Sequence, residues 1–114
     1  MARVSIEEIR RINKEHGYHF FDREAMHFFN SRLPRYGYHE GNKYYFVTSE
    51  QFDGRDTNGN YYQEPRKYTV RKMSENGNME EQEEFQKHQT YKAAEKELKK
   101  VAGIKEEKRI RNRG

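Results

Sequence analysis

The clearest pattern near the start of the chain is an apolar stripe with helical spacing. Three isoleucines recur three residues apart, with polar residues between them: Ile6, Ile9 and Ile12. This spacing places apolar side chains on one face of a helix. Ser5 precedes the stripe and Glu8 follows three residues later, which is the spacing of a capping box. The pattern predicts a helix over 6–16 that ends at Gly17.

Two further helices are predicted from caps and spacing. Asp22 is a candidate N-cap for a short helix over 23–30, and Pro34 prevents that helix from continuing. Near the other end, Thr90 is a candidate N-cap and Gly103 a natural stop. The last helix carries its apolar residues on one face, at Tyr91, Ala94, Leu98 and Val101.

Between these helices the pattern changes to the alternation that is typical of strands. Residues 43–50 are rich in Tyr, Phe, Val and Thr, which favour strands. The pair Gly41-Asn42 supplies a turn to the alternating segment 36–38, so a hairpin is predicted. Residues 51–65 contain glycine, asparagine and proline and are predicted to form a long loop.

The same reasoning gives two more strands and a fold class. Residues 66–73 alternate like a strand, Asn76-Gly77 is a strong hairpin turn, and 79–85 is an expected edge strand. The chain is therefore predicted to be α+β: an antiparallel sheet of three to four strands with two N-terminal helices and one C-terminal helix. We expect the helices on one face and the other face open, although the alternation within 43–50 does not choose between the faces.

Composition supports a small, aromatic core. Only 32% of the 114 residues are hydrophobic and 37% are charged, but nine Tyr and seven Phe supply large buried surfaces. One α+β domain is expected over 1–103, followed by a basic tail over 104–114. The tail holds five basic and two acidic residues and so carries +3 of the net charge of +4. The domain itself is almost neutral, which weakens charge as evidence for nucleic acid.

Candidate chemistry is sparse. The chain has no cysteine, its five histidines lack a convincing ligand spacing, and no serine lies in a G-x-S-x-G setting. Residues 80–84 are acidic and are interpreted as a solvated edge, so carboxylate catalysis is the least favoured hypothesis. Asp56, Asn58 and Asn60 alternate like calcium ligands, but the spacing fails the EF-hand template, and Asx turns are preferred. We expect no metal, no cofactor and no enzyme activity.

A second pattern interleaves basic residues with aromatic rings. Such surfaces bind single-stranded nucleic acid through phosphates and stacking, while Tyr and Arg are equally common in protein–protein hot spots. The candidate partner-binding residues are Arg32, Arg35, Tyr36, Tyr38, Lys43, Tyr45, Arg55, Tyr61, Tyr62, Arg66, Lys67 and Arg71.

Four segments carry a family resemblance. They are FFDREAMHFFNSR at 20–32, YFVTSE at 45–50, PRKYTVR at 65–71 and EFQ at 84–86. In these motifs the chain resembles a family of small uncharacterised proteins encoded by bacteriophages and other mobile elements. That origin implies an inhibitor of host defence, most concretely an anti-CRISPR protein that binds an RNA-guided nuclease.

Two functional hypotheses follow. The first is a phage or mobile-element protein that acts by binding a host protein in the bacterial cytoplasm, because no signal peptide or membrane span is evident. The alternative is a small nucleic-acid-binding accessory protein that uses its basic and aromatic strands with the basic tail. Steep loss of binding with salt would favour the second hypothesis.

Overall fold

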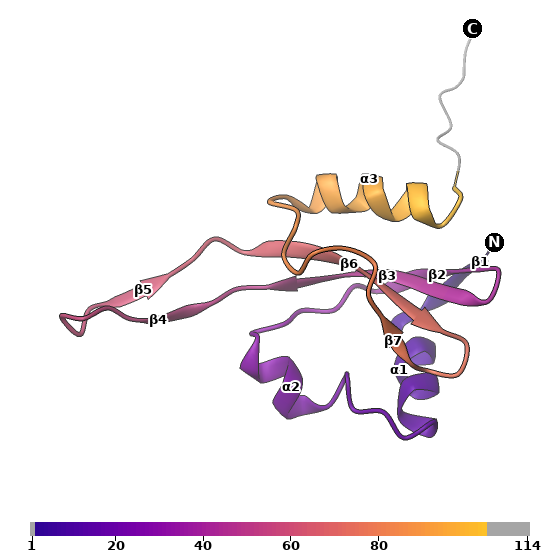
Figure 1. Cartoon of the computed structure of the whole chain (residues 1–114), viewed down its shortest axis with the longest axis horizontal. Helices are drawn as coiled ribbons and strands as arrows, with labels where there is room; N and C mark the ends of the chain where they lie inside the picture. The colour runs from indigo at the N-terminus through magenta and orange to yellow at the C-terminus, as the bar shows by residue number, and fades with distance from the viewer. Residues whose placement is uncertain (1, 105–114) are drawn as a thin grey trace, which may run out of the picture.

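The computed structural model describes residues 2–104 and has an α+β architecture (Figure 1). The main sheet is antiparallel and runs in the order β1-β2-β3-β6-β7. Its strands are β1 (Ala2–Ser5), β2 (Tyr36–Glu40), β3 (Lys43–Glu50), β6 (Lys67–Ser74) and β7 (Met79–Glu80). A separate two-stranded sheet pairs β4 (Asp53–Arg55) with β5 (Tyr61–Gln63). The helices are α1 (Ile6–Glu15), α2 (Arg23–Phe28) and α3 (Tyr91–Val101). The predicted α+β class and antiparallel sheet are confirmed.

Helices lie on both sides of the sheet, which corrects the prediction that they share one face. Figure 1 shows α3 on one side, with α1 and α2 on the other. The reason lies in β3, where Phe46 is 0% exposed and its neighbour Val47 is 4% exposed. Successive strand residues point to opposite faces, so both faces need an apolar cover.

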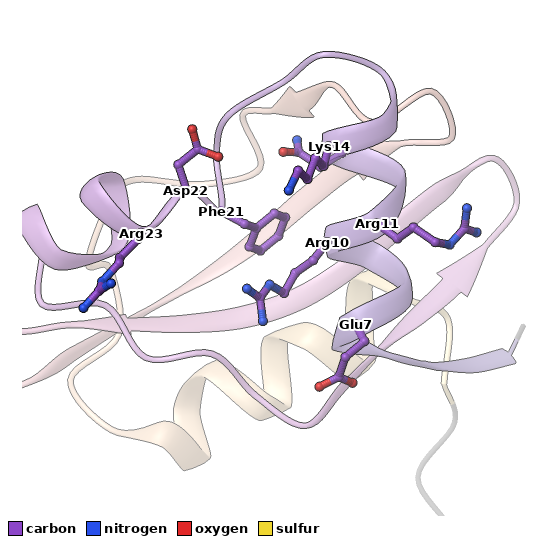
Figure 2. Close-up of a pocket in the computed structure, with 8 residues that line it drawn as sticks. Glu7, Arg10, Arg11, Lys14, Phe21, Asp22 and Arg23 are labelled. Carbon is purple, nitrogen blue, oxygen red and sulfur yellow. The ribbon is translucent and has the colours of Figure 1, made fainter.

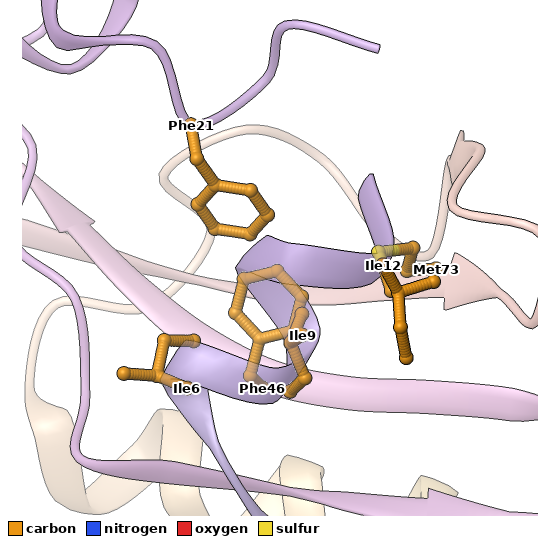
Figure 3. Close-up of a cluster of buried hydrophobic side chains, with 6 residues drawn as sticks. All are labelled: Ile6, Ile9, Ile12, Phe21, Phe46 and Met73. Carbon is orange, nitrogen blue, oxygen red and sulfur yellow. The ribbon is translucent and has the colours of Figure 1, made fainter. Parts of the chain in front are cut away.

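The first core cluster lies between α1 and the sheet (Figure 3). It consists of Ile6, Ile9, Ile12, Phe21, Phe46 and Met73. The helix approaches β2 closely at Gly37, where an added Cβ would lie 2.5 Å from the Tyr45 carbonyl oxygen and 2.9 Å from Cδ1 of Ile9. A glycine is therefore required for α1 to pack at this depth.

The second core cluster lies between α3 and the opposite face of the sheet. Its buried members are Tyr38, Val47, Val70, Ala94, Leu98 and Ala102. Five partly buried residues from the sheet, the end of α3 and the segment after it pack around them: Tyr36, Tyr45, Tyr68, Val101 and Ile104. This face of the sheet is thus unusually rich in tyrosine.

The helix predictions hold best where a local cap exists. Ser5 Oγ accepts a hydrogen bond from the Glu8 amide at 3.2 Å, and Thr90 Oγ accepts one from the amide of Ala93 at 3.1 Å. The second helix is shorter than predicted, since it ends at Phe28. Asp22 occupies its N-cap position but makes no side-chain cap bond. Without that bond, little local energy supports a longer helix.

Both edges of the sheet differ from the prediction. Strand β1 was not expected, and it forms by pairing with β2 in a register that places Arg3 opposite Tyr38. Strand β7 is much shorter than the predicted 79–85. The reason is that a Glu83 carboxylate oxygen accepts the Val70 amide at 2.7 Å, so a side chain satisfies the edge of β6 in place of a strand.

The prediction of a loop over 51–65 is wrong, because this segment forms the β4–β5 hairpin. Figure 1 shows the hairpin extending away from the helices as a long ribbon. Turn residues are confined to its tip, where Oδ1 of Asp56 accepts the amides of Asn58 and Asn60 at 2.9 Å each. These contacts confirm the Asx turns preferred over a calcium site. The predicted basic tail, beyond Ile104, lies outside the described residues.

Candidate functional site

The structure separates the predicted partner-binding residues into several places. Five of them lie on the α3 face of the sheet or at its edge: Arg32, Tyr36, Tyr38, Tyr45 and Arg66. Three lie on the ribbon: Arg55, Tyr61 and Tyr62. Lys43 also lies on the α3 face, at the first position of β3, where it bonds Glu80, and Arg35, Lys67 and Arg71 belong to neither group. The candidate site therefore has two parts, described in turn below.

The first part is the tyrosine–arginine surface, which we define as Arg3, Arg32, Tyr36, Tyr38, Tyr45, Arg66, Tyr68 and Tyr91. Its rings pack edge to face: the Tyr36 and Tyr38 centroids are 5.7 Å apart, and those of Tyr68 and Tyr91 are 6.0 Å apart. The Arg3 guanidinium lies 4.2 Å from the Tyr36 ring centroid. Strands β1, β2, β3 and β6 and helix α3 thus all contribute to one surface.

The electrostatics of this surface favour neutral rings. Burial raises the pKa of Tyr38 above its usual value, and the hydrogen bond with Tyr36 raises it further. Burial also raises the pKa of Tyr91, with an added contribution from Glu95. The Tyr38 ring is buried beneath α3, whereas Tyr91 is 45% exposed and can present a neutral phenol to a partner.

Arg66 is the least satisfied polar residue of this surface. Its Nη1 donates to Ser49 Oγ at 2.9 Å, whereas its buried Nη2 has no hydrogen-bond partner in the part of the chain that the structure describes. Burial lowers the pKa of Arg66, and the nearby Arg32 guanidinium lowers it further. An unsatisfied buried donor costs stability, because the group has lost its hydrogen bonds to water and gained none in return.

The second part of the site is the β4–β5 ribbon. Tyr61 is 57% exposed and Tyr62 is 46% exposed. The Tyr61 hydroxyl donates to Oδ2 of Asp53 at 2.8 Å, and this bond raises the pKa of Tyr61. The Tyr62 ring lies against Gly54, where an added Cβ would be 3.1 Å from its hydroxyl oxygen. Both rings are held in place while a large part of each faces solvent.

Arg71, by contrast, is engaged inside the protein. Its Nη2 donates to Glu50 Oε2 at 3.1 Å, and its Nε donates to Thr48 Oγ1 at 2.9 Å. The Glu50 side chain is 2% exposed. The guanidinium lies 5.3 Å from the Phe20 ring centroid, on the face opposite α3, and so Arg71 is separate from the tyrosine–arginine surface.

Two other charged positions also have internal partners. Lys43 Nζ donates to Glu80 at 2.6 Å, and this bond lowers the pKa of the Glu80 carboxyl. Glu83 was interpreted as part of a solvated edge, but its side chain is 4% exposed and contacts both the Val70 amide and His88. The acidic run 80–84 is therefore partly structural.

A groove between α1 and the segment leading into α2 was not predicted from the sequence (Figure 2). Its cavity measures about 350 Å³, with Phe21 and Asn13 among its lining residues. Basic side chains from both segments also line it: Arg10, Arg11, Lys14 and Arg23. The sequence signal that could have revealed it is the like-charged spacing of Arg10 and Lys14 on one helix.

Residues 2–104 contain no group of three or more His, Asp or Glu side chains placed to hold a metal ion. None of the three helices in this range is long and apolar enough to cross a bilayer.

The fold and surfaces define a class of protein: an α+β domain with helices on both faces of an antiparallel sheet and a projecting aromatic ribbon. The chain belongs to the Family of unknown function (DUF7447), whose model matches residues 5–99. No curated protein and no solved structure matches the chain.

Proposed function

We propose that this protein acts by binding a host protein, and that it is a phage or mobile-element inhibitor of a bacterial defence component, most concretely of an RNA-guided nuclease. The observation that carries the binding proposal is the pair of exposed, positioned rings on the ribbon, Tyr61 and Tyr62. Tyrosine is among the residues most enriched in binding hot spots, and a ring whose orientation is already fixed loses little entropy on binding.

The ribbon suits insertion into a partner. A two-stranded hairpin is marginally stable alone, and this one has no helix packed against it in Figure 1. It projects from a body whose own core lies elsewhere, so a partner can enclose it from both sides. The tyrosine–arginine surface offers a second contact area with neutral rings and cationic groups.

The nature of the partner rests on the resemblance to phage-encoded families and on charge. Residues 1–104 carry a formal net charge of about +1, so the domain does not imitate DNA through an acidic surface. Blocking a nuclease by wedging against its protein surface fits this charge better.

Affinity capture tests this proposal. Tagged protein is incubated with a bacterial lysate that contains an RNA-guided nuclease and its guide, and capture is repeated after nuclease treatment and at about 0.5 M salt. We expect the nuclease to be retained through both treatments. The Tyr61→Ala/Tyr62→Ala variant should lose it, whereas Tyr18→Ala, which changes a ring 38% exposed on the body, should not. Equal capture by the two variants would contradict the proposal.

The alternative function is nucleic-acid binding through the tyrosine–arginine surface. Arg32 and Arg66 are cations close enough to affect each other, and they lie beside several rings. Recovery of only RNA or DNA, lost at about 0.5 M salt, would favour this alternative because phosphate contacts weaken steeply with ionic strength.

A further inference from the structure

We propose that the groove between α1 and the start of α2 is a nucleotide-phosphate site. The groove lies on the face of the sheet opposite the tyrosine–arginine surface, and the inference is independent of the protein-binding function proposed above. It begins with three basic side chains that line the groove from two segments: Arg10 and Lys14 from α1, and Arg23 from α2, whose side chain extends away from α1 in Figure 2.

These three cations make no hydrogen bond or ion pair within residues 2–104. Arg11, their neighbour on α1, shows the contrast, because it bonds Glu8 and also Glu15 at 2.8 Å. On this helix Arg11 therefore forms ion pairs with two carboxylates, whereas Arg10 and Lys14 form none within residues 2–104.

The spacing of the unpaired cations is unfavourable for the helix alone. Like charges four residues apart destabilise a helix by a few tenths of a kcal/mol. Lys14 lies in the last turn, where the helix dipole favours a cation, but Arg10 has no such compensation. A bound anion would remove the repulsion between them.

The acidic side chains that line the groove do not cancel this charge. Asp22 lies 2.9 Å from Nδ1 of His19 and keeps its negative charge. Glu7 is the other acidic side chain of the lining. Three cations without ion pairs therefore share a concave surface with two carboxylates, which leaves the groove a formal excess of one positive charge.

Size and shape indicate a nucleotide more than a bare ion. The cavity of about 350 Å³ lies in the range of small-molecule sites and is far larger than one phosphate group. Figure 2 shows the Phe21 ring beside Arg10; the ring is 8% exposed, so a small part of it is accessible to a base or sugar. Guanidinium groups bind phosphate oxygens through paired donors, and Arg10 can supply such donors with Lys14 one turn further along α1.

The test is titration of the full-length protein with AMP at low salt, followed by amide NMR shifts and calorimetry. We expect AMP and inorganic phosphate to shift amides of α1 and residues 21–24, and adenosine, which lacks phosphate, to shift none. The Arg10→Gln/Lys14→Gln variant should weaken AMP binding at least tenfold. Lys92→Gln/Lys96→Gln removes the same charge at the same spacing from exposed positions on α3, and should leave the affinity within about twofold.

Equal weakening by the two variants, or binding of adenosine as tight as that of AMP, would overturn the proposal. Circular dichroism of both variants checks that α1 is intact, since glutamine is a good helix former. A single-stranded hexanucleotide is titrated as a second probe. If it binds much more tightly than AMP, and only with Arg10 and Lys14 present, the phosphate comes from a nucleic-acid chain. Similar affinities for the hexanucleotide and for AMP would show that the ligand of the groove is a free nucleotide.

Discussion

At the scale of single residues, most of the informative contacts involve polar side chains that the sequence presents as surface. Glu50 is the clearest case, because its carboxylate accepts hydrogen bonds from Thr48 at 2.6 Å and from Arg71 at 3.1 Å. Gln86 Nε2 donates to the Glu50 carbonyl at 3.2 Å. The network joins β3, β6 and the segment after β7, and each side chain in it has a hydrogen-bond partner within the network.

Removing the carboxylate from this network should be costly. We expect Glu50→Ala to lower the free energy of unfolding by about 3–5 kcal/mol, because Arg71 would remain half-buried without its counter-charge. Urea denaturation followed by circular dichroism measures the change. Glu84→Ala, at an exposed position, is the control and should stay within about 0.5 kcal/mol of the parent. A loss below about 1 kcal/mol for Glu50→Ala would show that the network is not a stabilising element.

The raised pKa of Tyr38 leads to a prediction of how the free energy of unfolding changes at alkaline pH. Burial raises its pKa in the folded protein above the ordinary value near 10, so between the two pKa values the unfolded chain releases a proton that the folded chain retains. The resulting stabilisation is complete below about pH 10 and is lost as the pH rises through the folded-state pKa.

The measurement is the free energy of unfolding between pH 9 and pH 11.5. We expect it to fall above pH 10 in the parent and to fall less steeply in Tyr38→Phe, which keeps the ring but has no phenolic proton. Tyr18→Phe, at an exposed position, serves as the comparison. Identical slopes in the parent and Tyr38→Phe would show that Tyr38 does not contribute.

At the scale of elements, the sequence predicted what local interactions determine. The capped helices α1 and α3 and the β2–β3 hairpin form where their caps, stripes and turns indicated. Strand β1 was not predicted because it forms only by pairing with β2, which is distant in the sequence. The ribbon was not predicted because β4 and β5 form by pairing with each other, and neither has a strong strand pattern of its own. The candidate site was predicted in part. The sequence identified its aromatic and basic residues, but their distribution over two faces of the sheet and the ribbon depends on the tertiary fold.

The ribbon should be separable from the rest of the fold. Replacing Gly54–Tyr62 by a two-residue Asn-Gly turn removes β5 contacts and the exposed tyrosines but leaves both core clusters intact. We expect the melting temperature to change by less than about 4 °C, which corresponds to under 1 kcal/mol for a domain of this size. Differential scanning calorimetry provides the value. A drop of more than about 10 °C would show that the ribbon stabilises the body.

At the scale of the whole molecule, the arrangement of layers was the main error of the sequence analysis. Antiparallel sheets commonly leave one face in water, and that general rule led to a prediction of two layers. Here Phe46 and Val47 are both buried, and α1 and α3 cover opposite faces. Three layers are possible in so small a chain because aromatic side chains fill much of each core.

Burial of both faces changes how the central strands keep their alignment. In a sheet with one wet face, sliding a strand by one residue exposes its apolar side chains, and this penalty fixes the pairing. For β3 against β6 the same slip would exchange one apolar layer for another, with a smaller penalty. The Glu50–Arg71 bond joins β3 to β6 and fits a single alignment of these two strands. This polar contact, more than hydrophobicity, selects the register in which Val47 is paired with Val70.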